Sequence, residues 1–219
     1  MRKVRATLRR QGLRVSHKRA WALMRQWGLV LPPAVRRDLQ APRGHVSVPE
    51  SNRGCGTDLT TKWARQDGWV AIVPVVECGD RGRLALGASP AQDTEAVLAP
   101  VVAALREAYG AAVAVPPGLE LRTDHGAPHT GSDCETRCRD WHLEHTSAPV
   151  GRPTGNAVTQ RFILTLKQGL LWTRDWERLA ELRQALEPWR AEHNHQRPHQ
   201  ALGWRTPAKQ RALPLPVAA

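Results

Sequence analysis

The stretch GWVAIVPVVEC, residues 68–78, is an apolar run of strand length, and GRLALGAS, residues 82–89, follows it after a short turn. Such a pair predicts two neighbouring β-strands. Further along, Asp93 is placed to cap a helix from residue 94 to 110, and residues 118–126 and 143–149 have the character of strands. The last third is helical in pattern, over residues 156–169 and 175–193. Strands that alternate with helices in this way predict an α/β layer architecture.

A basic segment precedes these strands. The formal net charge is +12, and residues 1–45 contribute +11 of it through 12 Arg or Lys and one acid. Residues 1–30 read as two helices around Gly12, with Ser16 capping the second, which predicts a small helix-turn-helix-like segment. Residues 31–50 are rich in proline and basic residues and are expected to form a linker. The charge favours nucleic acid as the partner, with a solubilising tail as the alternative.

Composition also bears on the compartment. No apolar run approaches the about 20 residues of a membrane span, and the N-terminus lacks a signal core, so a soluble cytoplasmic protein without a membrane partner is expected. The four cysteines form no dense disulfide framework. Cys134, Cys138 and His142 have the spacing of one helical face, but three ligands without a fourth make a poor structural zinc site. We expect the two cysteines to be buried in the core instead.

Two aspartates stand at predicted strand ends, Asp58 in GCGTDLTTKW and Asp124 in LELRTDHG. Two carboxylates on neighbouring strands repel each other, and a divalent metal cancels that repulsion. Mg²⁺ prefers such oxygens, and two metals could activate a nucleophile and stabilise the leaving oxygen of a phosphodiester. From spacing alone the alternative stays open that both aspartates are caps or turn formers.

Four blocks of sequence resemble one known family, the bacterial insertion-sequence transposases with a retroviral-integrase-type catalytic core, of the two-reading-frame class. The blocks are LRRQGLRVSHKRAWALMRQWGL (8–29), Asp58 followed by Thr60, RTDHGAPHT (122–130), and GRPTGNAVTQRFILTLKQGLLW (151–172) with NHQRPHQALGWRTPA (194–208). The resemblance implies an RNase H-like five-stranded mixed sheet with flanking helices. The core would span residues 51–208, followed by a tail at 209–219.

The resemblance also implies a catalytic set of two Asp and one Glu that hold Mg²⁺ or Mn²⁺. The two acids correspond to Asp58 and Asp124, which would be the metal ligands. The Glu is expected about 35 residues after the second acid, in the motif Asn-Ala-Val-x-Glu, and NAVTQ places Gln160 there. An amide lacks the negative charge, so the two-metal site would be weakened and the rate reduced. Gln160 could be engineered, could reflect natural decay of a mobile element, or could belong to a site that works with reduced metal affinity.

Residues for DNA contact are expected in both parts of the chain. Lys18, Arg19 and Arg25 project from the second basic helix, and Lys167 shares a helical face with Gln160. The resemblance gives Lys167 a DNA-facing role, and a solvated surface lysine is the alternative. Arg197 and His199 are expected either to contact DNA or to lock the last helix onto the core. His125 could orient a water or a phosphate or be structural. Trp63 or Trp204 could stack on an unpaired base, although most tryptophans are expected in the core.

The implied function is binding of transposon-end DNA, metal-dependent phosphodiester cleavage and strand transfer into target DNA. The implied partners are a second copy of the chain and an upstream helix-turn-helix protein of the same element. Two alternatives stay open: a catalytically inactive DNA-binding form of the same fold, and a general nuclease of that fold.

Overall fold

The computed structural model describes residues 2–30, 51–147 and 156–213. The expected linker, residues 31–50, and residues 214–219 of the expected tail lie outside this part of the chain. The domain boundaries proposed from the sequence stay predictions. The described helices and strands are α1 (Arg2–Arg10), α2 (His17–Gln26), β1 (Gly54–Thr57), β2 (Thr60–Ala64), β3 (Gly68–Glu77), β4 (Arg83–Ser89), α3 (Thr94–Tyr109), η1 (Ala112–Ala114), β5 (Leu119–Thr123), α4 (Ala127–Thr130), α5 (Ser132–Asp140), β6 (Leu143–Ser147), α6 (Ala157–Leu166), the π-helical turn η3 (Lys167–Leu171), α7 (Leu179–His195), η4 (Gln200–Leu202) and α8 (Pro207–Arg211).

The strands form one mixed sheet, with β3 between β4 on one side and β1 and β2 on the other. β1 and β2 both pair antiparallel with β3 in a single register, in which Thr57 faces Val75 and Thr60 faces Ile72. They are therefore two parts of one interrupted strand. β5 pairs parallel with β1, and β6 pairs parallel with β5. Within the described residues the six strands thus occupy five positions across the sheet, and the predicted five-stranded RNase H-like arrangement is confirmed.

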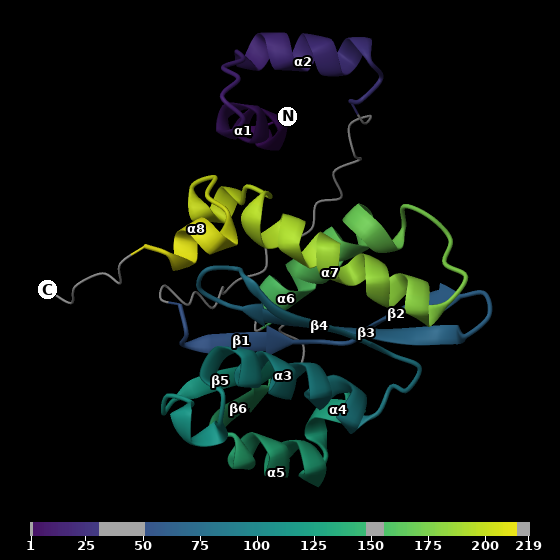
Figure 1. The fold of residues 1–219 in the computed structure, drawn as a ribbon, viewed down its shortest axis with the longest axis vertical. Coiled ribbons are helices and arrows are strands. Elements are labelled where there is room, and N and C mark those ends of the chain that lie inside the picture. The colour runs from purple at the N-terminus through teal and green to yellow at the C-terminus, as the bar shows by residue number, and fades with distance from the viewer. Residues whose placement is uncertain (1, 31–50, 148–155, 214–219) are drawn as a thin grey trace, which may run out of the picture.

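Helices cover both faces of the sheet: α6 and α7 lie on one face, and α3 and α5 lie on the other (Figure 1). β3 explains this arrangement, because alternate residues of a strand point to opposite faces. Val70, Ile72 and Val76 pack with α6 and α7, whereas Val75 packs with α3 and α5. The central strand is apolar on both faces, which accounts for its continuous hydrophobic run. Two hydrophobic cores result, one on each side of the sheet.

The predicted helix over residues 94–110 is confirmed as α3, and the side chain of Asp93 caps it by accepting a hydrogen bond from the Ala96 N–H at 2.9 Å. Pro100 lies inside this helix and is buried against β4. A Cβ atom at Gly87 of β4 would lie only 2.2 Å from Pro100 Cγ. The proline is therefore accommodated by a glycine on the neighbouring strand.

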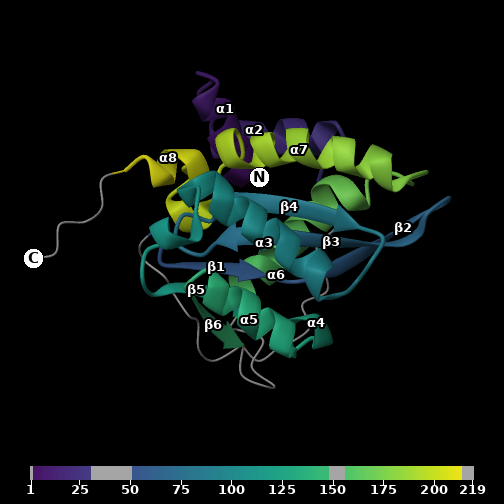
Figure 2. The ribbon, with the colours of Figure 1, turned by 60° about the horizontal axis from the view of Figure 1, so that its bottom comes forward.

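The two predicted N-terminal helices are present as α1 and α2, and Ser16 caps α2 by accepting from the Arg19 N–H. α1 lies next to the C-terminal end of α7 in both views (Figures 1 and 2), and in Figure 1 α2 lies on the far side of α1. Arg10 makes the connection, because its guanidinium donates to the backbone carbonyls of Gln196 at 3.1 Å and His195 at 2.9 Å. The carbonyls at a helix C-terminus carry partial negative charge, so an arginine is well suited to this contact. Of the described helices, none combines the length and apolar character needed to cross a membrane.

Candidate active site

Asp58 lies where β1 ends and before β2 begins, at the break in the interrupted strand. Its Oδ1 accepts a hydrogen bond from the backbone N–H of Leu59 at 2.8 Å. The residue is half-buried, and the buried Thr57 and Thr60 lie close on either side of it in the chain. The break therefore holds a carboxylate at the edge of the core.

Asp124 directly follows β5, the strand next to β1. The two strands pair parallel with Gly56 opposite Arg122, and the same register continued by two residues brings Asp58 alongside Asp124. Asp124 Oδ1 accepts from the Gly126 N–H at 2.9 Å and lies 2.6 Å from His129 Nδ1. His129 is only 1 % exposed. The second carboxylate is thus held by its own loop and by a buried histidine.

The charges of the two aspartates act on each other. Burial raises the pKa of Asp58, and the charge of Asp124 raises it further. The Leu59 N–H, His129 and Lys167 act on the Asp58 pKa in the opposite direction. A half-buried carboxylate next to a second one is costly to ionise, and a divalent cation between them would remove that cost. The donors are hard oxygens, which fits Mg²⁺ or Mn²⁺.

Helix α6, which carries Gln160, begins beside the strand end that precedes Asp58. The side chain of Asn156, just before the helix, donates to the Thr57 carbonyl at 2.9 Å and so ties the start of α6 to the strand end that carries Asp58. Gln160 follows Asn156 by one helical turn and is exposed. Lys167 lies further along, at the start of the π-helical turn, and its charge still acts on Asp58. Gln160 therefore lies between Asn156, which contacts the strand end before Asp58, and Lys167, whose charge acts on Asp58.

The remaining predicted contact residues lie elsewhere. Lys18, Arg19 and Arg25 are exposed on α2, where the Arg25 guanidinium lies 5.3 Å from the ring centre of Trp21. Arg197 is half-buried beneath α1, where burial lowers its pKa. The structure thus brings Asp58, Asp124 and Lys167 together and leaves these four cations outside that group.

His129 was not singled out from the sequence, which drew attention to His125 instead. His125 is exposed, whereas His129 turns back to Asp124 through the short helix α4. A histidine five positions after a strand-end aspartate is too weak a signal to have found this pair. The contact between His129 and Asp124 depends on the turn between them. This turn is closed by a hydrogen bond from the His129 N–H to the Gly126 carbonyl at 2.8 Å.

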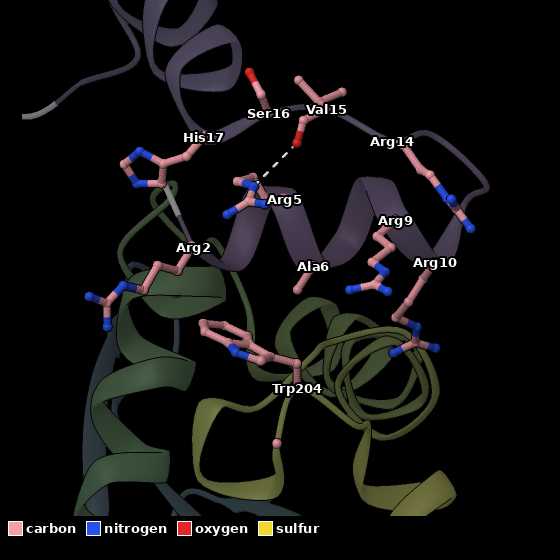
Figure 3. Close-up of a pocket in the computed structure, with 11 residues that line it drawn as sticks. Arg2, Arg5, Ala6, Arg9, Arg10, Arg14, Val15, Ser16, His17 and Trp204 are labelled. Atoms are coloured by element: carbon pink, nitrogen blue, oxygen red, sulfur yellow. Dashed lines mark hydrogen bonds between the residues drawn. The ribbon is translucent and has the colours of Figure 1, made fainter.

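A basic cavity lies between α1 and the loop around Trp204 (Figure 3). Its volume is about 940 Å³. Its charged lining comes mainly from one helix and the turn after it: Arg2, Arg5, Arg9, Arg10, Arg14 and His17. Trp204 lies on the opposite wall and faces Ala6 of α1 (Figure 3). Such a concentration of guanidinium groups beside an indole is typical of nucleic-acid contact surfaces.

A second cavity, of about 680 Å³, lies next to the first between α1 and α6. Five cationic residues line it: Arg2, Lys3, Arg81, Arg161 and Arg197. Burial and the charge of Arg197 lower the pKa of Lys3 to about 8. His199 lies there as well, and burial together with Arg197 and Lys3 lowers its pKa to about 4. The cations in this cavity repel each other, so an anion bound among them would be stabilising.

Trp63, the other tryptophan considered for base stacking, packs on a neighbouring strand instead. Its ring lies 5.5 Å from that of Trp69 in an edge-to-face arrangement, and both are exposed on the β2–β3 hairpin. Only Trp204 of the two lies at a cationic cavity.

Comparison with known proteins supports the fold. Residues 142–207 match the family model described as integrase core domain. The chain resembles a chain from the intasome of simian T-cell lymphotropic virus, solved in complex with PP2A regulatory subunit B56 gamma. The TM-score is 0.64 at 15 % identity, with 82 % of this chain and 61 % of that chain covered. It also resembles the integrase catalytic core of HTLV-2, solved in complex with magnesium, with a TM-score of 0.52, 12 % identity and coverage of 73 % and 96 %. The fold is that of an integrase core.

The proteins that match in sequence are bacterial transposases. The chain is 28 % identical over 218 residues to the transposase InsD of insertion element IS2A/D/F/H/I/K from Escherichia coli, covering 94 % of this chain and 71 % of that protein. The transposase InsD of IS2-9 from Escherichia coli K12 matches at the same identity, with 69 % of its length covered. The chain is therefore similar in sequence to these two bacterial insertion-sequence transposases.

Proposed function

We propose that this chain is the DNA-binding and strand-transfer core of an insertion-sequence transposase, with Asp58 and Asp124 as ligands of Mg²⁺ or Mn²⁺ and with chemistry impaired at Gln160. The observation that carries the proposal is the placement of Asp58 beside Asp124, where burial and the second charge raise the pKa of Asp58. The HTLV-2 core that shares the fold was solved with magnesium, which is consistent with this site.

The two carboxylates fit a hard divalent cation because both are oxygen donors at adjacent strand ends and neither is paired with an arginine in the described residues. A divalent ion bound there would activate the attacking oxygen and stabilise the leaving oxygen of a phosphodiester. His129 orients Asp124 by binding its Oδ1, and the Leu59 N–H orients Asp58. Water and then the freed 3′-hydroxyl would be the nucleophiles, and no covalent protein intermediate is involved.

Gln160 is expected to lower the catalytic rate, because it lacks the charge of a glutamate. Its amide oxygen can still approach a cation, but the site has two anionic ligands where the family has three. Lys167 adds a positive charge near Asp58 and is suited to hold a DNA phosphate at the site. The alternative function is a catalytically inactive form of the same fold that binds ends without cutting them, and Gln160 is the observation that favours it.

DNA would lie across the cationic cavities on the α1 side. The arginines of α1 offer phosphate contacts, Lys18, Arg19 and Arg25 offer further ones from α2, and Arg197 lies in the second cavity. The buried Nε of Arg81 has no hydrogen-bond partner in the described residues and could bind a phosphate oxygen. Transposon ends, target DNA, a second copy of the chain and an upstream helix-turn-helix protein of the same element are the proposed partners.

Metal binding is tested without DNA. Folding disfavours the ionised form of Asp58, because its folded pKa is raised by burial and by Asp124. Its contribution to stability is therefore present at low pH and lost as the pH rises through the folded pKa. Near neutral pH, Asp58→Asn is expected to raise the stability of the metal-free protein. Mg²⁺ should stabilise the unmodified chain by about 2–3 kcal/mol at about 100 times its Kd, and should not stabilise Asp58→Asn.

The measurement is the thermal unfolding midpoint with and without Mg²⁺. Asp140→Asn, at an exposed aspartate at the end of α5, is the control and should keep the full magnesium effect. A magnesium effect of the same size in Asp58→Asn would contradict the assignment of Asp58 as a ligand.

DNA binding in the second cavity is tested through Lys3. Because the Lys3 pKa is lowered to about 8 by burial and by Arg197, the free protein loses this charge just above neutral pH. A bound phosphate would restore the charge. The affinity for end DNA is expected to fall about 10-fold as the pH rises from about 7 to about 9.

Lys3→Arg should remove this pH dependence while keeping the affinity near neutral pH, since arginine stays charged. Fluorescence anisotropy at fixed salt would measure it. Lys18→Arg, on the exposed face of α2, should keep the dependence. If Lys3→Arg shows the same pH profile as the unmodified chain, the second cavity does not bind DNA.

A further inference from the structure

We propose that Cys134, Cys138 and His145 bind a zinc ion and that His129 supplies the fourth ligand, which gives a structural Cys2His2 site directly beneath Asp124. This site would adjoin the magnesium site proposed above, because His129 binds Asp124, but it does not depend on the chain being active. It takes a different class of metal because its donors are sulfur and imidazole nitrogen.

The geometry of three ligands is already in place. One ligand atom each from Cys134, Cys138 and His145 lies within 4.8 Å of the other two. The cysteines are one turn apart on α5, and His145 comes from the middle of β6, which lies next to that helix (Figure 1). Both cysteines are buried and reduced. Two thiols and an imidazole from two elements thus supply three of the four ligands of a structural zinc site.

The orientation of His145 suits a metal ligand. The Thr123 hydroxyl donates to the Asp124 carbonyl at 3.0 Å, so its oxygen is left to accept from His145 Nε2, which lies 2.9 Å away. This pattern places the proton on Nε2 and leaves the Nδ1 lone pair to bind a cation. Metal-binding histidines commonly donate their other N–H to such an oxygen acceptor, which fixes the ring.

His129 provides an independent sign that a ligand is missing. Its Nδ1 binds Asp124 Oδ1, while its Nε2 is buried and has no hydrogen-bond partner within the described part of the chain. Burial lowers the pKa of His145, and the charge of the nearby His129 lowers it further. A buried imidazole nitrogen without a partner is costly. His129 lies outside the group of three residues whose ligand atoms are mutually within 4.8 Å, so its Nε2 would have to move toward the bound ion. A zinc ion on Nε2 would then satisfy it and would form a carboxylate–histidine–zinc arrangement with Asp124.

Zinc is the metal that these donors favour. Burial raises the pKa of the Cys138 thiol to about 12, and the pKa of Cys134 is also raised. Zinc binds cysteine as the thiolate, so binding would release both thiol protons to the solvent. Mg²⁺ does not compete for thiolates, so Zn²⁺ would bind the cysteine site and Mg²⁺ would bind the carboxylate site.

The consequence concerns the loop that carries Asp124. Because His129 links Asp124 to the zinc ligands, the metal would fix the Asp124 carboxylate to α5 and β6. Residues 124–131, which include the short helix α4, would then be held by a coordination bond in addition to the hydrogen bonds of the turn.

The test uses the full chain without DNA or magnesium. After removal of metals by a chelator, Co²⁺ is added as a spectroscopic probe. We expect about one equivalent to bind with the strong visible bands of a tetrahedral site and a thiolate-to-cobalt charge-transfer band, and Zn²⁺ to displace it. Binding without the charge-transfer band, or no binding at all, would overturn the proposal, and neither result requires a variant.

Variants then assign the ligands. Cys134→Ser with Cys138→Ser should abolish the charge-transfer band, and His129→Gln should weaken Zn²⁺ binding about 10- to 100-fold and change the cobalt bands. Cys55→Ser and Cys78→Ser are the controls, because both are buried free cysteines outside this group, and Cys55 packs in the same core cluster as Cys134 and Cys138. Loss of the band in a control, with circular dichroism showing that it is folded, would reject the assignment.

Discussion

Gln160→Glu is expected to raise Mn²⁺- or Mg²⁺-dependent cleavage of a cognate transposon end by about 100-fold or more. The substitution restores a third negative charge on α6, between the contact of Asn156 with Thr57 and the approach of Lys167 to Asp58. Glutamate and glutamine have nearly the same size, and the residue is exposed, so the fold should not change. The measurement is single-turnover cleavage of a labelled end with each metal.

Gln168→Glu is the matched control, since it adds the same charge to an exposed glutamine in the adjoining π-helical turn. It should leave the rate unchanged. Equal activity of the unmodified chain and Gln160→Glu would reject the impaired-site interpretation. End binding in both proteins, with cleavage only in Gln160→Glu, would identify the natural chain as an end-binding protein that cuts poorly.

Gly56→Ala is expected to reduce the cleavage rate of the Gln160→Glu protein by about 100-fold, because a displacement of about 1 Å at a reacting centre is enough for such a loss. A Cβ atom at Gly56 would lie 2.3 Å from Thr159 Oγ1 and 2.8 Å from Asn156 Oδ1. Both atoms belong to the start of α6, so the helix would have to move away from β1. Residue 160 would move with it.

The control is Gly54→Ala on the same strand, where the added Cβ would meet its nearest atom, Glu120 Oε2, at 3.4 Å. That distance is ordinary van der Waals contact. Gly54→Ala should keep the rate, and unfolding midpoints should show that Gly56→Ala is still folded at the assay temperature. A full rate in Gly56→Ala would mean that α6 is not held in place by this contact.

Local patterns were sufficient for the fold. The apolar runs at 68–78 and 82–89 became β3 and β4, and Asp93 and Ser16 cap the helices that they were expected to cap. These features depend on a few neighbouring residues each, so a single sequence carries them. The break at Asp58 was not predicted, because the pairing of β1 and β2 with β3 is needed to show that they are one strand.

The surroundings of the site depend on contacts that no local pattern contains. Helical spacing grouped Cys134 and Cys138 with His142, but α5 ends at Asp140 and His142 has a positive φ of 54° in the following turn. His145, on the next strand, takes that place in the cluster. In the same way, the basic character of residues 1–45 was evident, whereas the contact of Arg10 with His195 joins residues 185 positions apart.

The shared register of β1 and β2 has a consequence for how this protein can lose activity. A substitution at Asp58 removes a carboxylate and leaves both halves of the strand aligned on β3. Deleting that single codon would shift β2 by one residue, which would bring exposed Trp63 into the core and carry buried Ala64 out of it. Missense changes at this position should therefore yield folded proteins that compete with active copies for transposon ends, whereas one-codon deletions should yield protein that is degraded.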